Sequence, residues 1–227
     1  MPTLTAVRQA QAGSASPAEL DHVPLRKGDK KNNNILPIPQ TMKIIAFSWS
    51  SRTGKSTAIA TMKEIFEKQG KKVKVFGETA QIYIDAHDWK IEDRYDFERF
   101  IVEKEIKRIY EIKDIKTNQQ YEIVLVDRAF LDVLVYIYRS IIHGYITNTD
   151  ILSHTPEIAL SKELYDVVVF FDTMLIPDEN FADYNNTDIN AIFRHTMHSV
   201  YGNKLLHYPN NKEFEKDIDM FLKRYIQ

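Results

Sequence analysis

The segment 54–57 reads Gly-Lys-Ser-Thr, and these residue types together are suited to holding the phosphates of a nucleotide. Gly54 lets the backbone approach a phosphate closely, Lys55 supplies positive charge to the β and γ phosphates, and the Ser56 hydroxyl is a ligand for Mg²⁺. The segment is the second half of the phosphate-binding pattern G-x-x-x-x-G-K-[ST], which predicts a site for ATP or GTP with Mg²⁺. The residues expected to contact the phosphates are Ser50, Ser51, Arg52, Thr53, Gly54, Lys55, Ser56 and Thr57.

Trp49 stands where the pattern has its first glycine. That glycine mainly permits a sharp exit from the preceding strand, whereas Gly54 and Lys55 make the phosphate contacts, so the essential half of the pattern is intact. Two positions of the Trp49 indole are compatible with the sequence. In one it lines the side of the site that takes a base or a substrate, and in the other it packs under the loop.

Three strand-end carboxylates are the next residues suited to chemistry: Glu78, Asp127 and Asp172. Asp127 best fits the metal side of the site, because four apolar strand residues lead straight into it and Mg²⁺ prefers carboxylate oxygens. Glu78 is then free to take the proton from an attacking hydroxyl. For each acid the structural alternative is a helix cap or a solvated turn, and we favour that alternative for Asp172.

The elements that must position these residues alternate between strand and helix. Residues 43–48 form an apolar run of strand type, and apolar side chains recur at helical spacing from the loop up to Gly70. The loop amides and the positive helix end therefore converge on one point. A parallel sheet covered on both faces is predicted, with ligands beyond the carboxyl ends of its strands. The later strands are predicted at 73–76, 123–126, 167–171 and within 203–211, a helical pattern over 81–113 is interrupted near 87–93, and one amphipathic helix is predicted over 212–226.

Composition limits the classes of function. The chain has 227 residues, 44% of them hydrophobic, which suits one α/β domain over 42–227 preceded by a flexible or loosely packed extension over 1–41. A formal charge of −2 gives no general electrostatic case for nucleic acid. The absence of cysteine excludes disulfides and thiolate catalysis and suits the cytoplasm. No apolar run approaches the length of a membrane span.

Four motifs in order resemble one family: TGKST, GETA after the second strand, VLVDRAFLDVLVY and LYDVVVFFD. They resemble the P-loop NTPase family that contains bacterial nicotinamide riboside kinases and the TRPL-translocation-defect protein, and they are also similar to deoxynucleoside and nucleotide kinases. The resemblance covers about residues 42–227. It implies a nucleoside-kinase-like three-layer α/β/α sandwich with a five-stranded parallel sheet in the order 2-3-1-4-5.

The resemblance also implies roles for single residues. Glu78 becomes a candidate base, Asp127 and Arg128 become the metal-side and phosphate-side charges, and Asp132, one helical turn beyond Arg128, matches an acid that faces the substrate. The catalytic residues expected are Lys55, Glu78, Asp127, Arg128 and Arg194; the metal ligands are Ser56 and Asp127; the substrate residues are Glu78, Tyr83, Arg128 and Asp132.

The segment after the fourth strand departs from the family pattern. It lacks the arginines that usually mark a lid over the transferred phosphate, and Arg194 is its only Lys or Arg. Either Arg194 swings in from its helix, or catalysis by the lid is weak, or this member of the family only binds nucleotide.

The leading hypothesis is a Mg²⁺-dependent P-loop kinase that moves the γ-phosphate of ATP or GTP to a hydroxyl of a nucleoside, nucleotide or riboside. The acceptor pocket is expected from aromatic and polar residues within 82–97 and along 130–139, with Tyr83, His87, Trp89 and Arg94 as candidates. One alternative is a kinase acting on a nucleic-acid hydroxyl, which the net acidity disfavours. The other is a nucleotide-binding switch or scaffold without kinase activity.

Overall fold

The computed structural model describes residues 41–48, 53–87, 93–145, 147, 154–172 and 187–226. Outside them lie the predicted extension up to residue 40 and the predictions made for Trp49, Ser50, Ser51, Arg52 and Trp89.

The centre of the fold is a five-stranded sheet in the order β2-β3-β1-β4-β5, and every neighbouring pair is parallel. The predicted strand order 2-3-1-4-5 is therefore confirmed. The strands are β1 (Lys43–Ser48), β2 (Val73–Phe76), β3 (Ile123–Asp127), β4 (Val167–Phe171) and β5 (Leu205–Tyr208).

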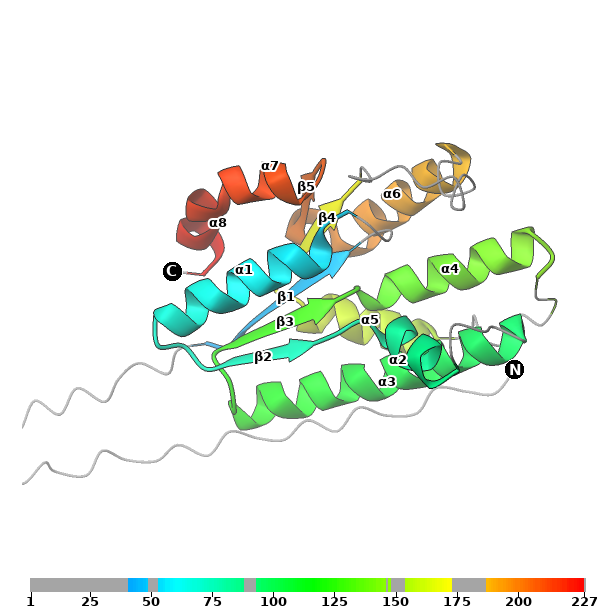
Figure 1. Ribbon diagram of the computed structural model, residues 1–227, viewed down its shortest axis with the longest axis horizontal. Helices are drawn as coiled ribbons and strands as arrows, with labels where there is room; N and C mark the ends of the chain where they lie inside the picture. Colours follow the sequence, from blue (N-terminus) through cyan, green and yellow to red (C-terminus); the bar gives the residue numbers. More distant parts are fainter. Residues whose placement is uncertain are drawn as a thin grey trace, which may run out of the picture. The chain divides into compact units, whose positions relative to one another are not determined.

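Helices cover both faces of this sheet, as Figure 1 shows. Parallel strands need crossover connections, and here each crossover contains one or more helices. The helices are α1 (Lys55–Lys68), α2 (Thr79–Ala86), α3 (Arg94–Asn118), α4 (Phe130–Ile142), α5 (Thr155–Leu164), α6 (Thr187–Tyr201), α7 (Asn211–Lys216) and α8 (Ile218–Tyr225), with a short 3₁₀ turn η3 (Gly202–Lys204) before β5.

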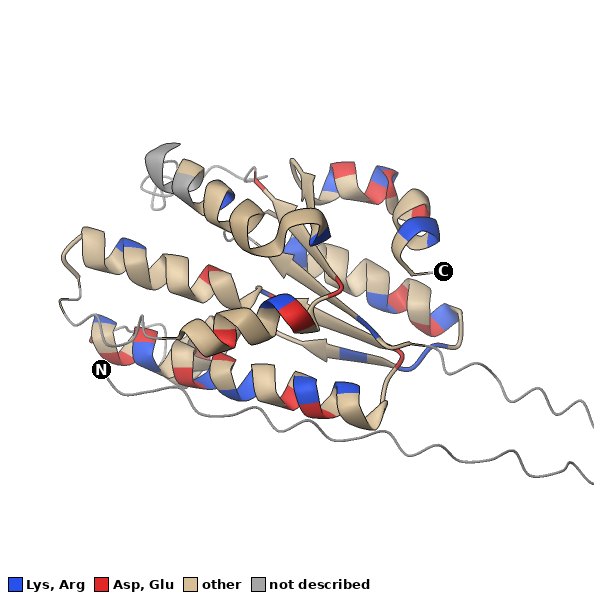
Figure 2. Cartoon of the chain, turned by 180° about the vertical axis from the view of Figure 1, so that it is seen from behind, with Lys and Arg blue, Asp and Glu red and all other residues tan. Residues whose placement is uncertain are grey.

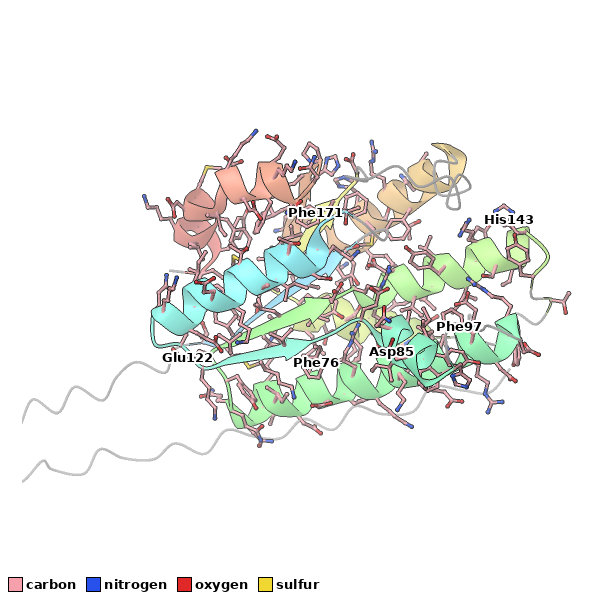
Figure 3. All side chains as sticks on the ribbon, viewed as in Figure 1. Phe76, Asp85, Phe97, Glu122, His143 and Phe171 are labelled. Atoms are coloured by element: carbon pink, nitrogen blue, oxygen red, sulfur yellow. The ribbon has the colours of Figure 1, made fainter. Side chains whose placement is uncertain are left out.

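Alternation along the central strand divides the core into two layers. Ile44 and Ala46 of β1 face the cluster formed with α3, α4, α5 and α6, whereas Ile45 and Phe47 face the cluster formed with α1, α7 and α8. All four side chains are fully buried, and Figure 3 shows side chains filling both spaces between sheet and helices. The predicted three-layer α/β/α sandwich is confirmed.

The last helical segment differs from its prediction. One amphipathic helix was expected over 212–226, but α7 ends before Asp217 and α8 begins after it. The Asp217 amide donates to the Phe214 carbonyl, three residues back, which tightens the last turn of α7 and ends that helix. Phe214 and Phe221 nevertheless pack edge to face, so the apolar pattern predicted the buried face correctly and missed only the break.

Within the described ranges, none of the helices is both long enough and apolar enough to span a membrane.

Candidate active site

The carboxyl ends of three neighbouring strands bring the predicted site residues to one edge of the sheet. Phe47 of β1 pairs with Asp127 of β3, and Phe76 of β2 pairs with Val126. The end of β3 thus lies between the ends of β1 and β2. Glu78 is two residues beyond β2 and Arg128 directly follows β3, so both lie at the edge where β1 ends.

Gly54 precedes α1 with φ +88°, in the left-handed region that glycine adopts without strain. A Cβ atom at this position would lie 2.2 Å from Oδ1 of Asn211, the first residue of α7. The backbone N–H of Asn211 also donates to the Thr53 carbonyl at 3.3 Å, and Thr53 is fully buried. The end of the loop is therefore fixed against α7, a contact that the sequence analysis did not predict.

Gly54→Ala is expected to lower the free energy of unfolding by roughly 3 kcal/mol, because it combines a left-handed φ with overlap against Asn211. Gly70→Ala is the matched control, since Gly70 has φ +75° and nothing within 4 Å of the added Cβ. The control is expected to cost about 1 kcal/mol, which is the backbone term alone. Urea unfolding of both variants measures the difference. Equal costs would show that α7 does not restrict the loop.

Ser56 and Asp127 form a pair suited to Mg²⁺. The Ser56 hydroxyl donates to Oδ2 of Asp127 at 3.0 Å. Asp127 is buried, and its Oδ1 has no hydrogen-bond partner among the described residues. A buried carboxylate oxygen left open beside a hydroxyl fits a Mg²⁺ ion, which takes one or two protein oxygens and completes its shell with water and phosphate. No group of three or more His, Asp or Glu residues in the described part of the chain could hold a metal by itself.

Lys55 lies buried at the start of α1, with 4% of its surface exposed. Burial and, to a smaller extent, the positive charge of Arg128 lower the pKa of its ammonium group to about 8, against the opposing effect of Asp127 and Glu78. The ammonium group therefore shares its surroundings with the strand-end acids. A buried cation at the start of a helix is a suitable group for binding an anion.

Arg128 holds Glu78 directly. Its Nε donates to Oε1 of Glu78 at 2.7 Å, and a terminal nitrogen donates to the same oxygen. Arg128 has φ +78°, and its own amide donates to the Phe47 carbonyl at 2.8 Å, which ties this strained residue to β1. Strain at a strand end is a common feature of functional sites.

Glu78 is ionised at neutral pH in this environment. Burial raises the pKa of its carboxyl group, but the positive charges of Arg128 and Lys55 outweigh burial and bring the pKa below its usual range. Glu78 occupies the cap position of α2, yet its side chain makes no capping hydrogen bond. The structural alternative for Glu78, a helix cap, therefore receives no support.

Tyr136 of α4 completes the surroundings of Arg128. The second terminal nitrogen of Arg128 donates to the Tyr136 hydroxyl at 3.1 Å, and the guanidinium carbon lies 5.0 Å from the centre of the Tyr136 ring. This geometry is a cation–π contact. Tyr136 lies within 130–139, a stretch predicted to contribute to the acceptor pocket, but the sequence analysis did not predict its contact with Arg128.

Two of the predicted substrate residues, Asp132 and Tyr83, are buried. Asp132 is fully buried, and its Oδ1 accepts a hydrogen bond from Ser48 at the end of β1, at 2.5 Å. Tyr83 of α2 stacks its ring on His87, with the ring centres 3.9 Å apart, and meets Phe97 of α3 edge to face. Asp132 thus lies at the exit of β1 toward the loop, and Tyr83 lies in an aromatic cluster. Their roles toward a substrate stay predictions.

Arg194 of α6 lies near the carboxyl end of β4, where its guanidinium pairs with Asp172, the residue after that strand, at 3.0 Å. His207 of β5 contacts the same carboxylate oxygen at 2.7 Å. The Asp172 side chain is only 15% exposed, so this acid is not solvated, while the helix-cap alternative stays a prediction because residues 173–186 lie outside the described ranges. Its place at the end of β4 brings it to His207 of β5 and Arg194 of α6 instead. The Arg194 side chain is 49% exposed, and its role in catalysis stays a prediction.

The chain's sequence matches no family profile and no curated protein. Its structure is similar to the NadR protein solved in complex with NR, with a TM-score of 0.54 and 16% identity over 82% of this chain and 52% of that one. The chain thus spans about half the length of that structure. The structure is also similar to thymidylate kinase from Candida albicans, with a TM-score of 0.47 and 10% identity over 81% of this chain and 92% of that one. A third similar structure is deoxyadenosine kinase from M. mycoides with bound dATP, with a TM-score of 0.44 and 16% identity over 81% of this chain and 98% of that one. The likeness to NadR shows the fold and agrees with the predicted fold class.

Proposed function

We propose that this protein is a Mg²⁺-dependent phosphotransferase that moves the γ-phosphate of ATP or GTP to a hydroxyl of a nucleoside-like small molecule. The observation that supports it best is the arrangement at the carboxyl edge of the sheet. The Ser56–Asp127 pair with its open oxygen lies at the end of β3, and the ionised Glu78, held by Arg128, lies at the end of the neighbouring β2.

The residues divide the chemistry between them. Lys55 and the backbone around Gly54 bind the β and γ phosphates. When bound through Ser56 and Asp127, Mg²⁺ neutralises phosphate charge. Glu78 accepts a hydrogen bond from the acceptor hydroxyl and takes its proton as that oxygen forms a bond to the γ-phosphorus and the bond to the nucleoside diphosphate breaks. Because the transition state of phosphoryl transfer is loose, orientation of the hydroxyl matters more than the strength of the base. An ionised Glu78 with a lowered pKa suits that role.

The proposed acceptor class is a nucleoside, nucleotide or riboside. NadR, whose fold is alike, was solved with NR, which supports an acceptor of riboside type. A nucleic-acid hydroxyl is less favoured, because Lys, Arg, Asp and Glu residues are interspersed along α3 (Figure 2), whereas binding to a phosphate backbone favours a continuous basic face.

The deciding experiment is a screen of nucleosides, nucleotides, ribosides and oligonucleotides with γ-labelled ATP and GTP in the presence of Mg²⁺. We expect transfer of label to one class of small acceptor. Tight nucleotide binding without transfer to any acceptor would favour the nucleotide-dependent switch instead. One observation supports that second candidate: Arg194, the only Lys or Arg of the predicted lid segment, is paired with Asp172 in this structure.

A further inference from the structure

Two charged residues of α3 lie on the face of that helix that packs toward the sheet. Glu105 is 1% exposed and Arg108 is 7% exposed, and they share this face with Ile101, Ile109 and Ile112. Burial of charged groups is costly unless they are paired and hydrogen-bonded, and an apolar pair of similar size often stabilises a core equally well. Their presence therefore calls for an explanation beyond packing.

Arg108 donates hydrogen bonds to backbone at the ends of two strands. One terminal nitrogen donates to the carbonyls of Gly77, at 3.0 Å, and of Asp127, at 3.1 Å. The other donates to the Arg128 carbonyl at 2.9 Å. Gly77 follows β2, Asp127 ends β3 and Arg128 follows it. A planar guanidinium has donors in a fixed fork, so these bonds fix the two strand ends relative to each other.

Glu105 extends the same network to the other side of Glu78. It forms an ion pair with Arg108 and accepts a hydrogen bond from the Thr79 hydroxyl. Thr79 is buried and begins α2, directly after Glu78. The residues on both sides of Glu78, Gly77 and Thr79, are thus held from α3, which lies along the β2 side of the sheet in Figure 1.

We propose that Arg108 and Glu105 are positioning residues of the transfer site: they fix the backbone that places Glu78 against Arg128, beside the strand end that carries Asp127. This inference rests on the proposed function and deepens it. Neither residue acts on the substrate. They act through the carbonyls of Gly77, Asp127 and Arg128, and through Thr79, and so set where the acceptor hydroxyl meets the γ-phosphate.

Arg108→Lys tests the inference with the charge retained. A lysine has one nitrogen on a flexible stem and cannot reproduce the fork that joins both strand ends. We expect kcat to fall about 10-fold to 100-fold, the effect of a small misplacement, while nucleotide affinity changes less than about twofold. Arg99→Lys is the matched control, since Arg99 lies on the same helix, is 60% exposed and pairs with Glu103. It should leave kcat and affinity unchanged.

A second measurement needs no acceptor. The Nε–H of Arg128 donates to Glu78, so its ¹H–¹⁵N signal reports that contact and is assigned by its change in Glu78→Gln. We expect this signal to shift or broaden in Arg108→Lys and to stay unchanged in Arg99→Lys. Glu105→Gln, which keeps the size of the side chain and removes its charge, should change the signal in the same way. This variant decides the matter if Arg108→Lys does not fold.

The outcomes separate this inference from the proposed function. An unchanged Arg128 signal in the folded variants would overturn the inference. An unchanged kcat accompanied only by a lower melting temperature would overturn it too, because the network would then merely stabilise the fold. Absence of transfer by the wild-type protein to any acceptor would refute the proposed function instead. The Arg128 signal would still test whether α3 positions the strand ends.

Discussion

Lys55→Ala is expected to weaken binding of Mg²⁺–ATP roughly 100-fold or more, a loss of about 3 kcal/mol. Lys55 is the first residue of α1, directly after the left-handed Gly54, and its ammonium group is buried beside Asp127 and Glu78. Removal of this cation leaves phosphate charge facing those acids without compensation. Isothermal titration calorimetry measures the affinity directly.

Lys68→Ala is the matched control for this variant. Lys68 lies in the last turn of the same helix, its side chain is 74% exposed, and it pairs with Glu64 on the surface. Its replacement should leave nucleotide affinity unchanged. Equal affinity of the wild-type protein and Lys55→Ala would refute the phosphate-binding role of the loop, whatever the control shows.

The lowered pKa of Lys55 adds a pH dependence with a definite sign. In the free protein the pKa is about 8, so the ammonium group is increasingly neutral above that pH. Bound phosphate favours the charged form and raises the pKa. Nucleotide binding near pH 8 should therefore take up a proton, and affinity should weaken as pH rises beyond 8 while staying nearly constant below 7. Calorimetry in buffers of different ionisation enthalpy detects the uptake, which should be absent in Lys55→Ala.

The sequence predicted those parts of the site that depend on local order. Gly54, Lys55 and Ser56 follow a strand and open a helix, so a short pattern was enough to place them. Asp127 was predictable because a buried strand ends on it. The strand order was not deduced from periodicity. It was implied by the family resemblance, and the structure confirms it.

The parts that were missed depend on contacts between side chains far apart in the chain. Arg108 meets Gly77 and Arg128 across 31 and 20 residues, and such pairings have no periodic signature. A partial signal existed, since Glu105 and Arg108 interrupt the apolar face of a helical pattern. The pairing of Asp172 with Arg194 and His207 likewise needed the positions of β4, α6 and β5 to be known.

Glu78→Gln is the variant that separates an enzyme from a switch. Glutamine keeps the size of the side chain and can still accept a hydrogen bond from Arg128, but it cannot take a proton at neutral pH. Turnover is expected to fall by roughly 10² to 10⁴ while nucleotide affinity changes little, the range of a positioned general base. Steady-state kinetics with the acceptor found in the screen, together with calorimetry, measure both quantities.

Stability provides the internal check on this variant. The Glu78 side chain makes no capping bond to α2, so loss of a cap is not expected to contribute. The Glu78 carboxylate does compensate the charge of Arg128, which is buried. Loss of that pairing should lower the free energy of unfolding by about 1–3 kcal/mol. A stability loss with unchanged turnover would show that the Glu78–Arg128 pair is structural only.

Asp127→Asn is the comparison that assigns the chemistry to the right carboxylate. It should impair the metal-dependent step under either hypothesis, because Asp127 accepts from Ser56 and holds the open oxygen suited to Mg²⁺. Glu78→Gln should impair only the transfer to an acceptor. If Glu78→Gln transfers phosphate at the wild-type rate, the acceptor-side role passes to Asp132, whose carboxylate is buried at the exit of β1. Asp132→Asn would then have to lower turnover in its place.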